Sequence, residues 1–196
     1  MSKRKKRPVD LPSMEQIIRE RERLRYRRRY SRTLKSTVAV LVVVAAAAVL
    51  VATLWMPVLR IYGTSMSPTL TDGQIVVTLK GSKFEPGELV AFYYGNKLLI
   101  KRVIAGPADW VDLDESGSVF VNGDLLDEPY LTAKAFGETN IELPYQVPDG
   151  RYFVMGDNRA TSVDSRTTAL GCVADDQIVG RVVFRIWPFS SFGAVR

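Results

Sequence analysis

The spacing of apolar and polar positions divides the chain into two different parts. Residues 37–56 (TVAVLVVVAAAAVLVATLWM) are almost wholly apolar, and no charged residue occurs between Lys35 and Arg60. These 20 residues would rise about 30 Å as a helix, the thickness of the hydrocarbon core of a bilayer. The pattern predicts one transmembrane helix over residues 37–56, with Trp55 at the membrane interface and Pro57 ending the helix.

Two other interpretations of this apolar segment stay open. A cleaved secretory signal is the first, although the apolar core of a signal peptide is only about 7–15 residues long. A buried core helix is the second, although such helices are seldom apolar around their whole circumference.

From residue 61 onward, short β-rich runs alternate with turn residues and predict a compact, mainly antiparallel β domain. Asn122-Gly123 is a two-residue hairpin signal, and Gly95-Asn96 is a weaker one. Residues 132–150 lack a pattern and are expected to form a long surface loop. The strands are expected at 74–79, 89–94, 97–104, 118–121, 152–155 and 178–186. The fold class is therefore mostly β behind one N-terminal transmembrane helix.

The charge is concentrated before the apolar segment. Residues 1–36 carry a net charge of +10, whereas the remaining residues carry −4. Ser13 and Gln16 fit a capping box, and residues 14–32 have helical composition. The positive-inside rule places residues 1–36 in the cytoplasm and a β-rich domain of residues 57–196 outside. The arginines could contact nucleic acid, but beside a membrane helix anionic lipid is the expected partner.

The composition excludes several classes of enzyme. The 196 residues include no histidine and a single cysteine, Cys172. A Ser-His-Asp triad, a Cys-His pair and an HExxH zinc site are therefore impossible, and acid-base chemistry must use a carboxylate, a lysine or a tyrosine. We expect no metal and no cofactor, and Cys172 is expected to be a small buried residue.

Three segments could carry chemistry. Residues 63–70 (GTSMSPTL) form a tight turn that could present a serine hydroxyl, or could be a plain polar turn. Residues 156–166 (GDNRATSVDSR) could hold a fixed hydrogen-bonded network, or could be a solvated charged loop.

The third segment, residues 98–104 (LLIKRVI), places adjacent cations in an apolar strand. Because alternate strand residues share a face, either Lys101 or Arg102 must lie on an apolar face. A buried lysine loses its proton readily and could act as a general base. The alternative is an edge-strand lysine whose amine lies in water.

Together and in this order, these segments resemble bacterial type I signal peptidases. Ser65–Leu70 matches the S-M-x-P-T-L motif, Lys101–Val103 matches K-R-V, and Gly156–Arg166 matches G-D-N-R-x-x-S-x-D-S-R. Residues 121–131 (VNGDLLDEPYL) are also similar to the family, and the single anchor resembles the short Gram-positive form. The resemblance covers roughly residues 55–190.

The resemblance implies a membrane-anchored endopeptidase that removes signal peptides from secretory preproteins at the bacterial plasma membrane. Ser65 would be the nucleophile, its backbone N–H would bind the oxyanion, and Lys101 would be the unprotonated general base. Ser162 would orient the lysine amine, and an Asp164–Arg166 ion pair would brace the loop. The remaining matched motif residues are expected to support the site: Met66, Pro68, Gly156, Asp157, Asn158 and Arg159.

Several features depart from the family or leave alternatives open. Gly63 stands where some members have a serine that donates to the oxyanion, and residues 105–109 (AGPAD) have alanines at two expected glycines. The family's substrates have small residues at the first and third positions before the cut. The aromatic residues in 187–192 (WPFSSF) could rest on the membrane surface or pack in the core. A non-catalytic binding module and a self-cleaving Ser-Lys regulator are the rival functions.

Overall fold

The structure is a computed structural model that describes residues 13–195. It contains two separate units, with the boundary between Val51 and Ala52. The expected basic arm begins before the described range, so its residues 1–12 lie outside the description, as does Arg196 at the end of the expected β domain.

The described part of the N-terminal unit lies in one continuous helix, α1 (Met14–Trp55), whose last residues, 52–55, belong to the second unit. The predicted capping box is confirmed: Gln16 N–H donates to Ser13 Oγ over 3.4 Å, and Ser13 N–H donates to Gln16 Oε1 over 3.0 Å. The arm and the apolar segment thus share one helix with no break at residue 36. None of its described side chains is buried, which contradicts the core-helix interpretation. The helix is long and apolar enough to cross a membrane.

Most strands of the second unit form one eight-stranded sheet. Its strand order is β1-β2-β11-β3-β4-β9-β10, β12 pairs with β11, and every pairing is antiparallel. The strands are β1 (Val58–Arg60), β2 (Ile75–Leu79), β3 (Leu89–Tyr94), β4 (Lys97–Ala105), β9 (Arg151–Met155), β10 (Val173–Ala174), β11 (Ile178–Trp187) and β12 (Gly193–Ala194). Two short 3₁₀ helices, η1 (Asp175–Gln177) and η2 (Phe189–Ser191), flank β11.

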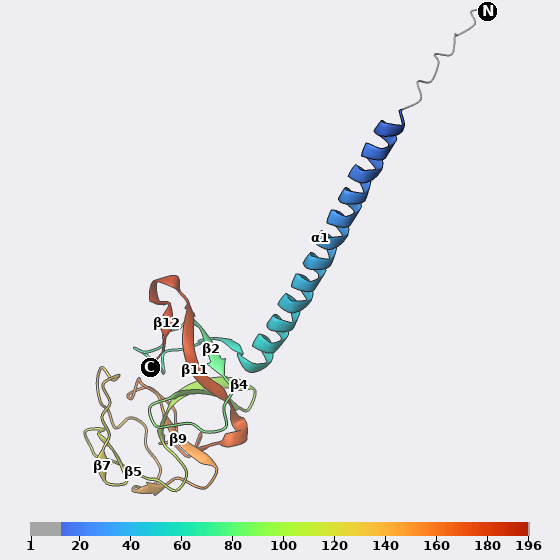
Figure 1. The fold of residues 1–196 in the computed structure, drawn as a ribbon. Coiled ribbons are helices and arrows are strands. Elements are labelled where there is room, and N and C mark those ends of the chain that lie inside the picture. The colour runs from blue at the N-terminus through green and yellow to red at the C-terminus, as the bar shows by residue number, and fades with distance from the viewer. Residues whose placement is uncertain (1–12, 196) are drawn as a thin grey trace, which may run out of the picture. The chain divides into compact units, whose positions relative to one another are not determined.

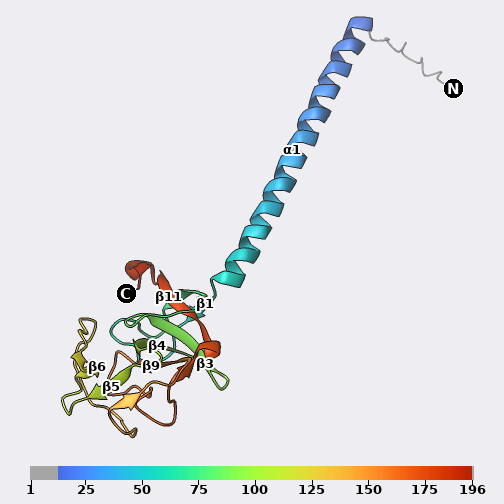
Figure 2. The same cartoon turned by 60° about the horizontal axis from the view of Figure 1, so that its bottom comes forward.

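A second, four-stranded antiparallel sheet has the order β7-β6-β5-β8. Its strands are β5 (Trp110–Leu113), β6 (Val119–Val121), β7 (Asp124–Leu125) and β8 (Tyr145–Gln146). Figure 1 and Figure 2 show β5, β6 and β7 gathered at one side of this unit, away from β11. Asn122 and Gly123 both have positive φ, 54° and 90°, so the predicted two-residue hairpin is confirmed between β6 and β7.

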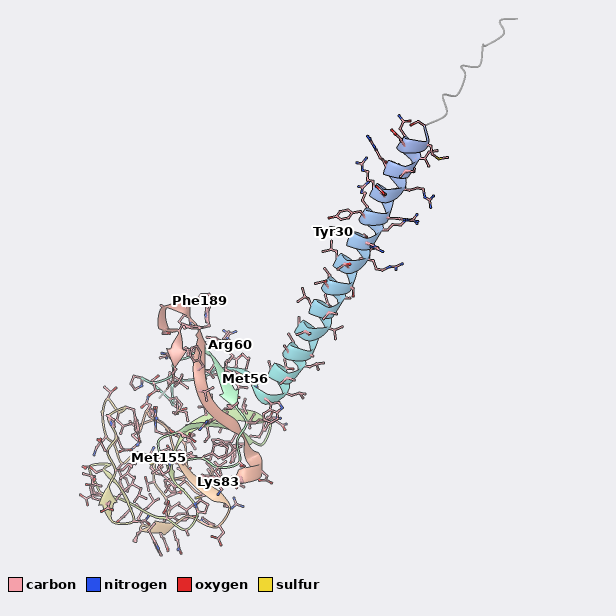
Figure 3. The ribbon with its side chains drawn as sticks, in the orientation of Figure 1. Tyr30, Met56, Arg60, Lys83, Met155 and Phe189 are labelled. Carbon is pink, nitrogen blue, oxygen red and sulfur yellow. The ribbon has the colours of Figure 1, made fainter. Side chains whose placement is uncertain are left out.

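The core explains why β4 is central to the site. One buried cluster contains Ile104 of β4 and Phe153 of β9 against the second sheet, while another contains Val103 of β4 and Val90 of β3. Both faces of β4 are therefore covered from Lys101 to Ala105. Figure 3 shows the labelled Met155 of β9 in the interior of this unit.

The six predicted strands are confirmed to within one residue at each end. The alternation did not predict β1, β5, β7, β8, β10 or β12, each of two to four residues. The expectation of a pure surface loop over residues 132–150 is wrong in part. That segment includes β8, and its side chains Phe136, Ile141 and Leu143 pack against the core.

Candidate active site

Ser65 lies in the loop between β1 and β2 and is partly exposed. The loop is anchored by its apolar residues, because Met66 and Leu70 are buried in a core cluster and Leu70 N–H donates to the Met66 carbonyl over 2.8 Å. Within residues 13–195, the backbone N–H of Ser65 donates no hydrogen bond. The loop therefore presents both the hydroxyl and a free backbone donor at one residue.

Lys101 lies on β4 between β3 and β9 and is only 3% exposed. Its amine donates a hydrogen bond of 2.8 Å to Ser162 Oγ. Burial lowers the pKa of this amine from 10.5 to about 8, although nearby Asp164 acts to raise it. The edge-strand alternative, with the amine in water, is therefore wrong.

Gly156 brings the serine loop and the lysine pocket together. A Cβ at residue 156 would lie 2.6 Å from the Ser65 carbonyl oxygen and 2.2 Å from Ser162 Oγ. Only glycine allows this approach. The next contact fixes the serine loop, because Asn158 N–H donates to the Ser65 carbonyl over 3.0 Å.

Within residues 13–195, the Lys101 amine donates to Ser162 Oγ and makes no hydrogen bond with the Ser65 hydroxyl. In free enzymes, catalytic hydrogen bonds are often longer than in complexes with substrate. Gly156 nevertheless lies against the backbone of Ser65 and against Ser162, which accepts the hydrogen bond of the Lys101 amine.

The expected ion pair is present in full. Arg166 Nε donates to Asp164 Oδ1 over 2.8 Å, and both side chains are fully buried. Asp164 Oδ2 accepts from Gly156 N–H over 3.0 Å. Arg166 also donates to the Phe136 carbonyl over 2.7 Å and to the Arg159 carbonyl over 2.9 Å. This pair therefore joins the polar loop to the 132–150 segment.

Two further ion pairs were not predicted. Arg102 donates twice to Asp157, over 2.9 Å and 2.7 Å, and Arg159 pairs with Glu128. All four side chains are at most 1% exposed. The expectation that Lys101 or Arg102 would lie on an apolar face was too narrow, because both are buried. The apolar residues around Arg102 could have indicated that this arginine is buried. For Glu128, the only indication was that it lies in a segment similar to the family.

Pro68, the remaining predicted site residue, is exposed and borders a hollow next to Asn158. A second hollow borders Ser65 itself, and most of the residues around it are apolar. Its walls come from the chain before the serine and from β4: Leu59, Arg60, Ile61, Tyr62, Gly63, Met66, Leu98, Leu99 and Ile100.

The departures from the family pattern have local explanations. Gly63 has φ +88°, which favours glycine, and its N–H donates to Asp72 Oδ1 over 2.7 Å. Ala108 adopts φ +68°, so this alanine itself takes the left-handed conformation that a glycine would supply. That conformation costs an alanine about 1 kcal/mol.

The aromatic residues at the end of β11 and just after it lie on the surface rather than in the core. Phe189 is 76% exposed, and Trp187 and Phe192 are about half exposed. Trp187 packs on Phe189, and Phe192 packs on Phe184. Figure 3 shows Phe189 at the outer end of the hairpin that joins β11 to β12.

Comparisons with known proteins identify the family. The family model described as "Signal peptidase, peptidase S26" matches residues 33–187. This chain belongs to the signal peptidase family. Signal peptidase IB of Staphylococcus aureus (strain COL) is 41% identical over 152 residues, which cover 67% of this chain and 78% of that protein. Signal peptidase I of Bacillus licheniformis is 36% identical over 165 residues, covering 78% and 87%.

A crystal structure of a signal peptidase I from Enterococcus faecalis V583 is 27% identical and covers 50% of this chain and 96% of its own, with a TM-score of 0.44. The relatives confirm the sequence-based assignment: the chain is a bacterial type I signal peptidase, a serine endopeptidase. The signal peptidase family cleaves signal peptides, and a Ser-Lys pair is typical of it.

Proposed function

We propose that this signal peptidase cleaves the signal peptides of secretory preproteins with Ser65 as nucleophile and Lys101 as general base. The observation that carries the proposal is the environment of Lys101: its amine is buried, has a pKa lowered to about 8, and donates to Ser162, which lies against the same glycine as the Ser65 backbone. A base with a pKa near the working pH is suited to proton transfer. No histidine is available for this role in the sequence.

The reaction would proceed by acyl transfer. Ser65 Oγ attacks the carbonyl carbon of the scissile bond while its proton passes to Lys101 Nζ. The oxyanion accepts a hydrogen bond from the free Ser65 N–H. Lys101 then gives the proton to the leaving amine of the mature protein. Water, deprotonated by the same amine, hydrolyses the acyl-enzyme and restores the Ser65 hydroxyl.

The supporting residues would act through orientation. Ser162 accepts a hydrogen bond from the Lys101 amine and thereby fixes its direction. Asp164 holds Gly156 N–H and Arg166, so it fixes the turn on which Ser65 and Ser162 pack. A rigid frame of this kind keeps the reacting groups close to productive geometry.

Substrate selection would use the hollow beside Ser65. Its walls are formed by residues 59–63, by Ser65 and Met66, and by residues 98–100 of β4. A small hollow next to the nucleophile, lined mostly by apolar residues, accepts small side chains and excludes large ones. This supports substrates with small residues before the cut.

The membrane placement is also part of the proposal. Residues 37–56 would span the bacterial plasma membrane, with residues 1–36 in the cytoplasm and residues 57–196 outside it. The exposed, wholly apolar part of α1 supports a lipid surrounding, and the arginines before it suit anionic headgroups rather than nucleic acid. The exposed aromatics Trp187, Phe189 and Phe192 would contact the same membrane surface.

The test is cleavage of a preprotein by the full chain in detergent, with N-terminal sequencing of the product. The wild type should cut after a small-x-small tripeptide, and Ser65→Ala should lose all activity while keeping the wild-type melting temperature. Ser116→Ala, at an exposed serine in the turn between β5 and β6, is the matched control and should cleave normally. Wild-type turnover by Ser65→Ala would disprove the assignment of the nucleophile.

A further inference from the structure

The segment of residues 127–131, which follows β7, contacts the polar loop of residues 156–166 through the Glu128–Arg159 pair; we call it the strap. Glu128 is the buried side chain of the strap, and both of its carboxylate oxygens accept hydrogen bonds from Arg159. Tyr130 donates its hydroxyl to Glu128 Oε1 over 2.9 Å. Burial raises the pKa of Tyr130 well above its usual range, so this hydroxyl stays a donor.

The ring of Tyr130 covers the second buried arginine. The Arg102 guanidinium carbon lies 3.8 Å from the centre of this ring. The same guanidinium makes the paired hydrogen bonds to Asp157 and donates to the Gly87 carbonyl over 2.7 Å. Within the strap, Glu128 therefore holds Arg159, and Tyr130 covers Arg102.

These two arginines control the turn that supports the nucleophile. Arg102 holds the side chain of Asp157, and Arg159 Nε donates to the Gly156 carbonyl over 3.3 Å. Asn158, between these contacts, donates its N–H to the Ser65 carbonyl. The path from the strap to Ser65 thus runs through the two buried arginines, the backbone of residues 156–158 and the Asn158–Ser65 hydrogen bond. The charged hydrogen bonds along this path resist small displacements.

We propose that Glu128 and Tyr130 are positioning residues for Ser65, acting through Arg159 and Arg102 on the turn Gly156–Asn158. The inference rests on the proposed role of Ser65. Neither residue touches the reacting atoms, and Glu128 is not among the charges that act on the Lys101 amine, which are Asp164, Arg166 and Asp157. We therefore expect a change at Glu128 to alter the placement of the nucleophile and not the pKa of the base.

The experiment compares kcat, KM and the pH profile of preprotein cleavage for the full chain in detergent. Glu128→Gln keeps the shape of the side chain and removes the charge that holds Arg159. It should lower kcat about 10- to 100-fold, since small misplacements of reacting groups have effects of that size. KM and the inflection near pH 8 should stay at wild-type values. Asp127→Asn, the same chemical change at the exposed neighbouring residue, is the control and should keep wild-type kcat.

Tyr130 provides an independent pair of variants if Glu128→Gln fails to fold. Tyr130→Phe keeps the ring over Arg102 and should retain kcat to within about threefold, whereas Tyr130→Leu removes the ring and should lose about tenfold or more. If Tyr130 only filled space, kcat would not be retained in Tyr130→Phe and lost in Tyr130→Leu when the two variants have equal melting temperatures.

Two results would overturn the inference in different ways. Wild-type kcat in both Glu128→Gln and Tyr130→Leu, measured below their melting temperatures, would show a purely structural strap while leaving the role of Ser65 intact. A wild-type enzyme without Ser65-dependent cleavage would overturn the proposed function and this inference with it.

Discussion

The two faces of β4 carry adjacent buried cations whose surroundings differ. Lys101 is 3% exposed and has one neutral hydrogen-bond partner, the Ser162 hydroxyl. Arg102 is 1% exposed and has a carboxylate, a backbone carbonyl and an aromatic ring. Burial alone therefore does not decide the role of a cation. A buried amine without a directly bonded anion gives up its proton easily, whereas a fully paired guanidinium holds the structure together.

The largest effect on activity is expected when Lys101 is replaced by a residue that keeps its positive charge. In Lys101→Arg the side chain remains a cation and cannot accept the proton of Ser65. Its kcat/KM for preprotein cleavage should fall about 10²- to 10⁴-fold, the usual contribution of a general base. If this variant kept more than a tenth of wild-type activity, the contrast between a proton-accepting Lys101 and a structural Arg102 would be wrong.

On the other face, Arg102→Met should lower the stability of the fold as well as kcat. Removing Arg102 leaves Asp157 buried without its partner, which typically costs about 3–5 kcal/mol. Urea unfolding of the full chain in detergent measures the change. The double variant Arg102→Met/Asp157→Leu should recover much of the loss, and an unchanged stability in the single variant would contradict the structural role of Arg102.

Lys101→Met should have the opposite effect on stability. The folded-state pKa of Lys101 is about 8 and its ordinary value is 10.5, so the unfolded chain binds the extra proton more readily. The resulting destabilisation is about 3 kcal/mol below pH 8, falls as the pH rises, and vanishes above pH 10.5. The methionine variant should therefore be more stable than wild type at pH 7 and similar at pH 10.5. A stability difference that does not change with pH would argue against the shifted amine.

The smallest effect is expected at the exposed start of the same strand. Lys97 is exposed, so Lys97→Met should change the free energy of unfolding by less than about 0.5 kcal/mol and leave cleavage unchanged. A large effect here would mean that membership of β4, rather than burial, determines the behaviour of its lysines.

The fold could be predicted where the chain has long, regular patterns. The six longer runs gave strands at the right places, and Asn122-Gly123 identified its hairpin. Strands such as β10 and β12 have only two residues, and such short segments carry no alternation to detect. These two strands form only because they pair with β9 and β11.

The site could be predicted only in part, because its key interactions join distant segments. Ser65, Lys101 and Ser162 were identified from motifs, and the Asp164–Arg166 pair was expected. The double burial of β4 could not be inferred, since it depends on the second sheet covering one face. Likewise, Glu128 gains its role only where the strap meets Arg159.

The most direct test of the account is the pH dependence of kcat/KM for preprotein cleavage, which reports the ionisation of the free enzyme. A neutral Lys101 amine as the base predicts activity that rises with pH through an inflection near 8. The same profile should be found in Lys97→Met, whose altered lysine lies outside the site. A rise delayed to about pH 10.5, or a rate independent of pH between 6 and 10, would contradict the assignment of Lys101 as the general base.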